Sequence, residues 1–73
     1  MKLPRASGKQ TVDALLRTGF TVHRTRGSHY ILKDLKAGRR VTIPYHRQEL
    51  APKTLRSILK QAGVSTEMFS KLL

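Results

Sequence analysis

The stretch RTRGSHYILK, residues 24–33, places a histidine where proton chemistry on a phosphodiester could take place. His29 follows a Gly-Ser pair and precedes an apolar run, and Arg24 and Arg26 lie a few residues before it. An exposed histidine exchanges protons near neutral pH. Arginine side chains bind phosphate oxygens, and Gly27 has no side chain to keep a phosphate away.

These residue types suit the cleavage of RNA without a metal ion. The 2′-hydroxyl is an internal nucleophile that needs a base, and the leaving oxygen needs a proton donor. Cations then stabilise the charge that develops on the phosphate. His29 fits one of the two proton-transfer roles, and the sequence leaves His46, Tyr30 or a lysine open for the other. A single strand histidine is more often structural, so the motif alone does not decide the matter.

The charge of the whole chain indicates a polyanionic partner. Its 73 residues contain 15 Lys and Arg but only 4 Asp and Glu, which gives a net charge of +11. The basic residues are spread along the sequence, so the charge belongs to a folded domain and not to a tail. Such a field attracts nucleic acid first, then acidic proteins or anionic membranes. We expect residues 1–73 to form one domain.

Several other functional classes find no support in the residues. The chain has no cysteine, and its three histidines come from separate segments without the paired spacing of a metal site. There is no Gly-rich phosphate loop, no Ser-His-Asp set and no acidic pair. No apolar run approaches the ~20 residues that span a bilayer. We therefore expect a cytoplasmic protein that uses no metal and no cofactor.

The hydrophobic pattern predicts an α-β-β-β-α order followed by a short third helix. SGKQ reads as a capping box that opens a helix over residues 8–18, and Gly19 stops it. Three alternating segments follow, at residues 20–24, 28–33 and 40–45, with connections short enough for an antiparallel meander. Pro44 marks the end of the third strand. We expect the helices to cover one sheet face and leave the other, which carries His29, free.

The second helix begins at Pro52 and ends at Gly63. Beside its apolar stripe run Lys53, Arg56 and Lys60 at spacing i, i+3, i+7, which predicts a phosphate-binding stripe near a helix N-terminus. The alternative is a merely solvated face. A final helix is capped by Ser65, with four apolar residues available for packing: Met68, Phe69, Leu72 and Leu73.

Four stretches, LPRASGKQTVDALLRTGF, RGSHYIL, VTIPYH and ELAPKTLRSILKQAGVSTEMF, resemble HicA-type toxins of bacterial and archaeal type II toxin–antitoxin systems. The similarity covers nearly the whole chain in order and spacing. It implies a fold like that of double-stranded-RNA-binding domains, an α+β architecture with a three-stranded antiparallel sheet. It also implies mRNA interferase activity with His29 of the GSH motif as the catalytic residue. Gly27 and Ser28 match the rest of that motif, whereas Ala51 and Lys53 depart from the commonest form.

The resemblance further implies a partner. A HicB-type antitoxin would bind the toxin and block its active face, and the complex would repress its own operon. Two other functions remain open on the residues alone. One is a non-catalytic double-stranded-RNA-binding module, which the fold and charge fit equally well. The other is a small interaction protein whose charge serves only an acidic partner.

Overall fold

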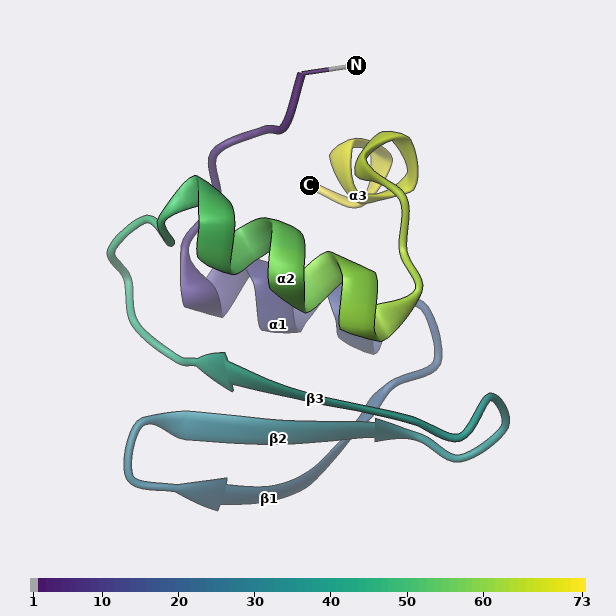
Figure 1. The fold of residues 1–73 in the computed structure, drawn as a ribbon. Helices are drawn as coiled ribbons and strands as arrows, with labels where there is room; N and C mark the ends of the chain where they lie inside the picture. Colours follow the sequence, from purple (N-terminus) through teal and green to yellow (C-terminus); the bar gives the residue numbers. More distant parts are fainter. Residues whose placement is uncertain (1) are drawn as a thin grey trace.

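The computed structural model of the chain, which describes residues 2–73, has the expected order of elements (Figure 1). The expected α+β class and the short third helix are confirmed. In chain order the elements are α1 (Gly8–Leu16), β1 (Thr21–Arg26), β2 (His29–Asp34), β3 (Arg39–Pro44), α2 (Pro52–Ala62) and α3 (Thr66–Leu72).

The three strands form one antiparallel sheet in the order β1-β2-β3. Paired residues share a face, so the pairs Tyr30–Ile43 and Leu32–Val41 lie on one side of the sheet. Leu32, Val41 and Ile43 are buried there in a core cluster with residues of α1 and α2. The opposite side, called the open face below, carries His29, Ile31 and Lys33 of β2, Arg40, Thr42 and Pro44 of β3, and Arg24 and Arg26 of β1.

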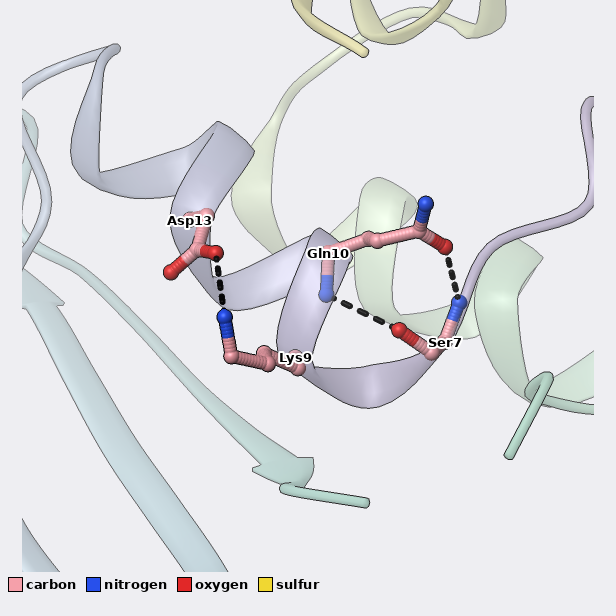
Figure 2. Close-up of polar contacts among 4 residues, drawn as sticks. All are labelled: Ser7, Lys9, Gln10 and Asp13. Atoms are coloured by element: carbon pink, nitrogen blue, oxygen red, sulfur yellow. Dashed lines mark hydrogen bonds and ion pairs between the residues drawn. The ribbon is translucent and has the colours of Figure 1, made fainter. Parts of the chain in front are cut away.

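Helix α1 begins with the predicted capping box, which Figure 2 shows. The backbone N–H of Gln10 donates to the Ser7 hydroxyl at 3.0 Å, and the backbone N–H of Ser7 donates to the Gln10 side-chain oxygen at 2.9 Å. The helix ends at Leu16, two residues before the expected end. The backbone N–H groups of Arg17 and Thr18 donate to the carbonyls three residues before them, which tightens the last turn into a 3₁₀ form.

The N-terminus of α1 lies against the end of β3. A Cβ atom added to Gly8 would clash with the carbonyl oxygen of Pro44, so only glycine fits at this position. The backbone N–H of Lys9 donates to the carbonyl of His46 at 3.1 Å. These contacts fix the segment that leaves β3 and, through the ladder, the strand end at which Pro44 pairs with His29.

Helix α2 presents its predicted apolar stripe to the core. Leu55, Ile58, Leu59 and Ala62 are buried, and Gly63 ends the helix with a left-handed backbone at φ 70°. In α3 the Ser65 hydroxyl accepts from the Met68 N–H at 3.1 Å, as expected of its cap. The expected packing of α3 is only partly present. Phe69 is fully buried, whereas Met68 and Leu73 are 51% and 47% exposed.

The helices cover the sheet unevenly. They contact chiefly β3, and Figure 1 shows β1 as the strand farthest from them. Val22 consequently stays 43% exposed although it pairs with fully buried Leu32. The register also shifts between Val22 and Arg24, where His23 forms a bulge. Strand β1 is therefore exposed along its whole length.

Candidate nucleic-acid interface

His29 is held at the start of β2 by a turn and by the strands on either side. Gly27 makes the turn after β1 with a φ of 58°, a conformation that residues with side chains rarely adopt. The Ser28 carbonyl accepts a hydrogen bond of 2.6 Å from the Tyr45 N–H, which ties this turn to the end of β3. His29 then pairs with Arg26 and with Pro44, and its side chain is exposed on the open face.

The open face is strongly cationic. Its ladder positions bring together four basic side chains from three strands: Arg24, Arg26, Lys33 and Arg40. This register places both arginines of RTRGSH on the same face as His29. Ile31, with its ladder neighbours Arg24 and Thr42, lies between the two ends of the face and is only 5% exposed. It belongs to neither core cluster.

The acidic residues lie elsewhere. Asp13 pairs with Lys9 at 3.6 Å, and Glu49 and Glu67 pair with Arg5 and Lys71 at 3.7 Å each. The fourth, Asp34, accepts from the backbone N–H groups of the β2–β3 turn at 3.1 and 3.3 Å. Within residues 2–73, no ion pair therefore involves a cation of the open face. The charge of this face is available to an external anion.

His23, in the bulge of β1, responds to this charge. Lys33 lowers the pKa of His23 most, followed by slight desolvation and by Arg24 and Arg40. The three cations all belong to the open face, so His23 faces the same electrostatic environment. The sequence predicts a surface strand residue at this position, as observed, but the bulge could not be predicted because it cannot be recognised from strand alternation.

A groove joins the open face to helix α2. On one side lie His29, Thr42 and Pro44, and on the other lie Lys53, Thr54, Ser57, Ile58 and Gln61. Its volume is about 490 Å³, within the range of about 300–1,000 Å³ that small-molecule sites occupy. No carboxylate lines this groove, named the His29 groove from here on. It combines an imidazole, an ammonium group and neutral hydrogen-bonding side chains.

The structure divides the predicted basic stripe of α2. Lys53 lines the His29 groove, whereas Arg56 lines a separate hollow beside the N-terminal segment around Pro4 and Arg5. Successive helix residues are rotated by about 100°, so Arg56 turns away from the groove, and Lys60, although on the same side of the helix as Lys53, is not among the residues that line it. Thr54, Ser57 and Gln61 do line it, and the sequence pattern did not single them out. These three residues lie beside the apolar stripe in the sequence pattern, but neutral side chains do not indicate the binding of a polyanion.

The three candidates for a second proton-transfer group are placed differently. Tyr30 lies on the helix-covered side of the sheet, where its ring stacks on Tyr45 with centroids 4.1 Å apart. His46 is exposed just after β3, outside the His29 groove, and its carbonyl accepts from Lys9. Of the lysines, Lys53 shares the groove with His29. The structure thus brings only the lysine alternative into the same hollow as the histidine.

Two general features concern the part of the chain that the structure describes. Residues 2–73 contain no cluster of three or more His, Cys, Asp or Glu side chains able to hold a metal ion. Over the same residues, each helix is too short and too polar to cross a bilayer.

Comparison with known families gives one match. The family model described as the HicA toxin of bacterial toxin–antitoxin systems matches residues 8–64, from the first residue of α1 to just beyond the end of α2. Comparison with curated proteins gave no match. The family match includes the GSH turn, the whole open face and the His29 groove. The chain therefore belongs to the HicA family of toxins from bacterial toxin–antitoxin systems.

Proposed function

We propose that this toxin is an endoribonuclease that cleaves mRNA without a metal ion. The observation that carries the proposal is the position of His29, exposed in a groove with Lys53 and next to a cationic face without internal ion pairs. In this proposal residues 1–73 form a single toxin domain that acts in the cytoplasm. Open-face cations hold the RNA backbone while the groove receives the phosphodiester to be cleaved.

The proposed reaction uses the RNA's own 2′-hydroxyl. A base removes its proton, the 2′-oxygen attacks the phosphorus, and the bond from phosphorus to the 5′-oxygen breaks. The leaving oxygen takes a proton, which gives a 2′,3′-cyclic phosphate and a 5′-hydroxyl end. His29 serves as the general base or acid, a role worth about 100- to 10,000-fold in rate.

The second role falls to Lys53 because it shares the groove with His29. With His29 as the base, its ammonium group donates the proton that the leaving oxygen takes, and it also stabilises negative charge on the phosphate. Arg24 and Arg26 bind neighbouring phosphates through paired N–H donors. Gly27 and Ser28 shape the turn that leaves room for the backbone. Arg56 and Lys60, which do not line the groove, contribute to the field that attracts RNA.

The same surface explains inhibition. Membership of the family implies a partner antitoxin, and we propose that it is of the HicB type. An acidic partner would be steered toward the open face by its unpaired cations. Covering that face would block RNA binding and the chemistry together, and the resulting complex could also act on its own operon.

The decisive experiment compares the wild type with His29→Ala on a long single-stranded RNA in EDTA, with binding measured beside cleavage. His46→Ala is the matched control, because it also removes an exposed imidazole but from outside the groove. We expect cleavage by the wild type and the control, no cleavage by His29→Ala, and RNA binding by all three. Binding without cleavage by any of them would support the alternative, a non-catalytic double-stranded-RNA-binding module.

A further inference from the structure

The α2 side of the His29 groove differs in chemistry from the open face. Thr54, Ser57 and Gln61 present two hydroxyls and an amide, all uncharged and exposed. The Gln61 side-chain nitrogen donates to the Ser57 hydroxyl at 3.1 Å, so the amide is oriented by its neighbour. Uncharged hydrogen-bonding side chains contact phosphates as well as bases, but unlike a cation such as Lys53 they carry no charge to favour the phosphate, and they can distinguish one base edge from another.

The hydrogen bond to Ser57 leaves Gln61 with one free N–H and a free carbonyl oxygen. A donor beside an acceptor matches a base edge that offers an acceptor beside a donor. On the Hoogsteen edge only adenine presents this pattern, through N7 and its exocyclic amine, and glutamine pairs with that edge through two hydrogen bonds. Pro44 and Ile58 add apolar surface to the same groove, against which the face of a base can pack.

The position of Gln61 along α2 decides which nucleotide it meets. Figure 1 shows α2 beginning above the end of β3 and running back along that strand. Lys53 therefore lies at the Pro44 end of the groove, the end at which His29 pairs with Pro44. Gln61 follows eight residues later, about 12 Å along the helix axis. An RNA with its cleaved bond at His29 thus places an adjacent nucleoside beside Ser57 and Gln61.

We propose that Gln61, oriented by Ser57, reads the base next to the cleaved bond and favours adenine there. The inference rests on the proposed ribonuclease function, because the cleaved bond defines the position of the base. It makes Gln61 a specificity-determining residue with no part in the proton transfers. The competing explanation is that Ser57 and Gln61 form an ordinary side-chain pair on a solvated helix surface.

The test uses oligonucleotides in which a single ribonucleotide supplies the only 2′-hydroxyl, so that only one bond can be cleaved. Each of the four bases is placed in turn on either side of that bond, and kcat/KM is measured for the eight combinations of base and side. We expect the wild type to favour adenine on one side by about 5-fold or more, the lower end of what one bidentate base contact provides. Gln61→Ala should remove this preference while cleaving the least favoured substrates at the wild-type rate.

Two further variants make the result specific. Gln61→Glu keeps the size of the side chain but offers only acceptors, so its preference should move from adenine toward cytosine. Gln48→Ala is the control, since Gln48 is an exposed glutamine outside the groove, and it should keep the preference for adenine.

Equal cleavage of all four bases by the wild type, or a preference unchanged in Gln61→Ala, would overturn the inference. Either result would leave the ribonuclease function intact, because cleavage would still depend on His29. If the wild type cleaves no substrate, or if His29→Ala cleaves as fast as the wild type, the proposed function fails and this inference fails with it.

Discussion

The helix-covered side and the open face of this protein differ in whether their polar and charged groups have partners. On the helix-covered side, the capping box satisfies the first turn of α1, and acids on α1 and α3 pair with cations on the same helix. On the open face, four cations and His29 share one surface with no ion pair among residues 2–73 to neutralise them. Like charges held close together destabilise a fold.

This contrast indicates which side serves stability and which serves function. A protein that places 4 acidic residues among 15 basic ones could relieve the repulsion by distributing the acids evenly. Here two acids pair with cations on the helices, Asp34 accepts hydrogen bonds in the β2–β3 turn and Glu49 pairs with Arg5, so the sheet face is left cationic. Substitutions on the two sides should therefore separate cleanly into effects on unfolding and effects on RNA.

The largest expected effect is on the helix-covered side. Phe69→Ala removes a fully buried ring of α3 from the cluster that contains Ala14, Leu55 and Leu59. Such a truncation costs about 3–5 kcal/mol, out of the roughly 5–15 kcal/mol that hold a domain folded. Urea unfolding measures the decrease. His29→Ala is the counterpart on the open face and should change the free energy of unfolding by less than about 0.5 kcal/mol.

Phe69 also tests the limits of the functional unit. Helix α3 lies beyond residues 8–64, the segment that the family model matches. If Phe69→Ala unfolds at the same urea concentration as the wild type, the packing of α3 against Ala14, Leu55 and Leu59 contributes little to stability.

The next effect connects the two sides. Gly8→Ala would force a methyl group against the Pro44 carbonyl. It should cost about 3 kcal/mol, the upper end of what overpacking costs. Because Pro44 pairs with His29, the variant should also have reduced cleavage activity under conditions in which it is still folded. Urea unfolding and cleavage assays measure the two effects.

Gly38→Ala is the control for Gly8→Ala. Gly38 has a φ of 68° but open space around it, so the substitution introduces backbone strain without a clash. We expect a decrease in stability of about 1–2 kcal/mol and normal cleavage by the folded protein. Equal effects of the two variants on cleavage would show that the contact between Gly8 and Pro44 does not support the site.

Gly8 illustrates what the sequence could and could not predict. The capping box, the apolar stripe of α2 and the order of the strands follow from local spacing, and the structure confirms each of them. The need for glycine at position 8 arises from a strand end some 36 residues away in sequence. Within a helix start, that glycine carries no local sign of the contact.

The candidate site shows the same division. Strand alternation placed His29 opposite Tyr30 and Leu32, and the ladder agrees. The basic spacing of α2 suggested a continuous stripe, whereas the packing angle of the helix brings Lys53 into the groove and turns Arg56 away from it. Helical spacing defines a face but not which neighbour it meets. Strand alternation also places Tyr30 on the face opposite His29, and the structure stacks it there on Tyr45.

A smaller effect concerns the charge of the open face. In a His29→Ala background, which allows binding without cleavage, Arg24→Ala with Arg26→Ala should flatten the salt dependence of RNA binding. The slope of log affinity against log salt should fall by about 0.7 for each phosphate of a single strand that the variant no longer neutralises. Affinity measured from 50 to 300 mM salt gives the slope. The free energy of unfolding should not fall, because these arginines have no ion-pair partner within residues 2–73.

The matched control removes two paired cations, with Lys9→Ala and Lys71→Ala. Each substitution removes an ion pair at spacing i, i+4, worth about 0.2–0.5 kcal/mol, and neither lies on the open face. Stability should fall slightly while the salt slope stays close to that of the parent. A slope that falls equally in both double variants would mean that RNA responds to the net charge and not to a defined face.

The smallest effect is on pH dependence, through His23. Lys33 and, to a lesser degree, Arg24 and Arg40 lower its pKa in the folded state. Below the ordinary pKa of histidine, about 6.5, the unfolded chain therefore binds this proton more readily than the folded one. The free energy of unfolding should fall as the pH drops through this range and recover as it rises. His23→Gln should make that fall shallower. Urea unfolding between pH 7.5 and 5 measures it, and 1 M salt should shrink the difference, since it shortens the screening length to about 3 Å.

RNA should reverse this shift, because its phosphates offset the cations that lower the pKa of His23. Binding then takes up a proton, so affinity should rise as the pH falls from about 7.5 to 6. In the His29→Ala background, the rise should be smaller with His23→Gln than with His23 in place. An equal rise in both proteins would mean that the RNA does not approach the bulge of β1. The bound strand would then be confined to the part of the open face nearer the His29 groove.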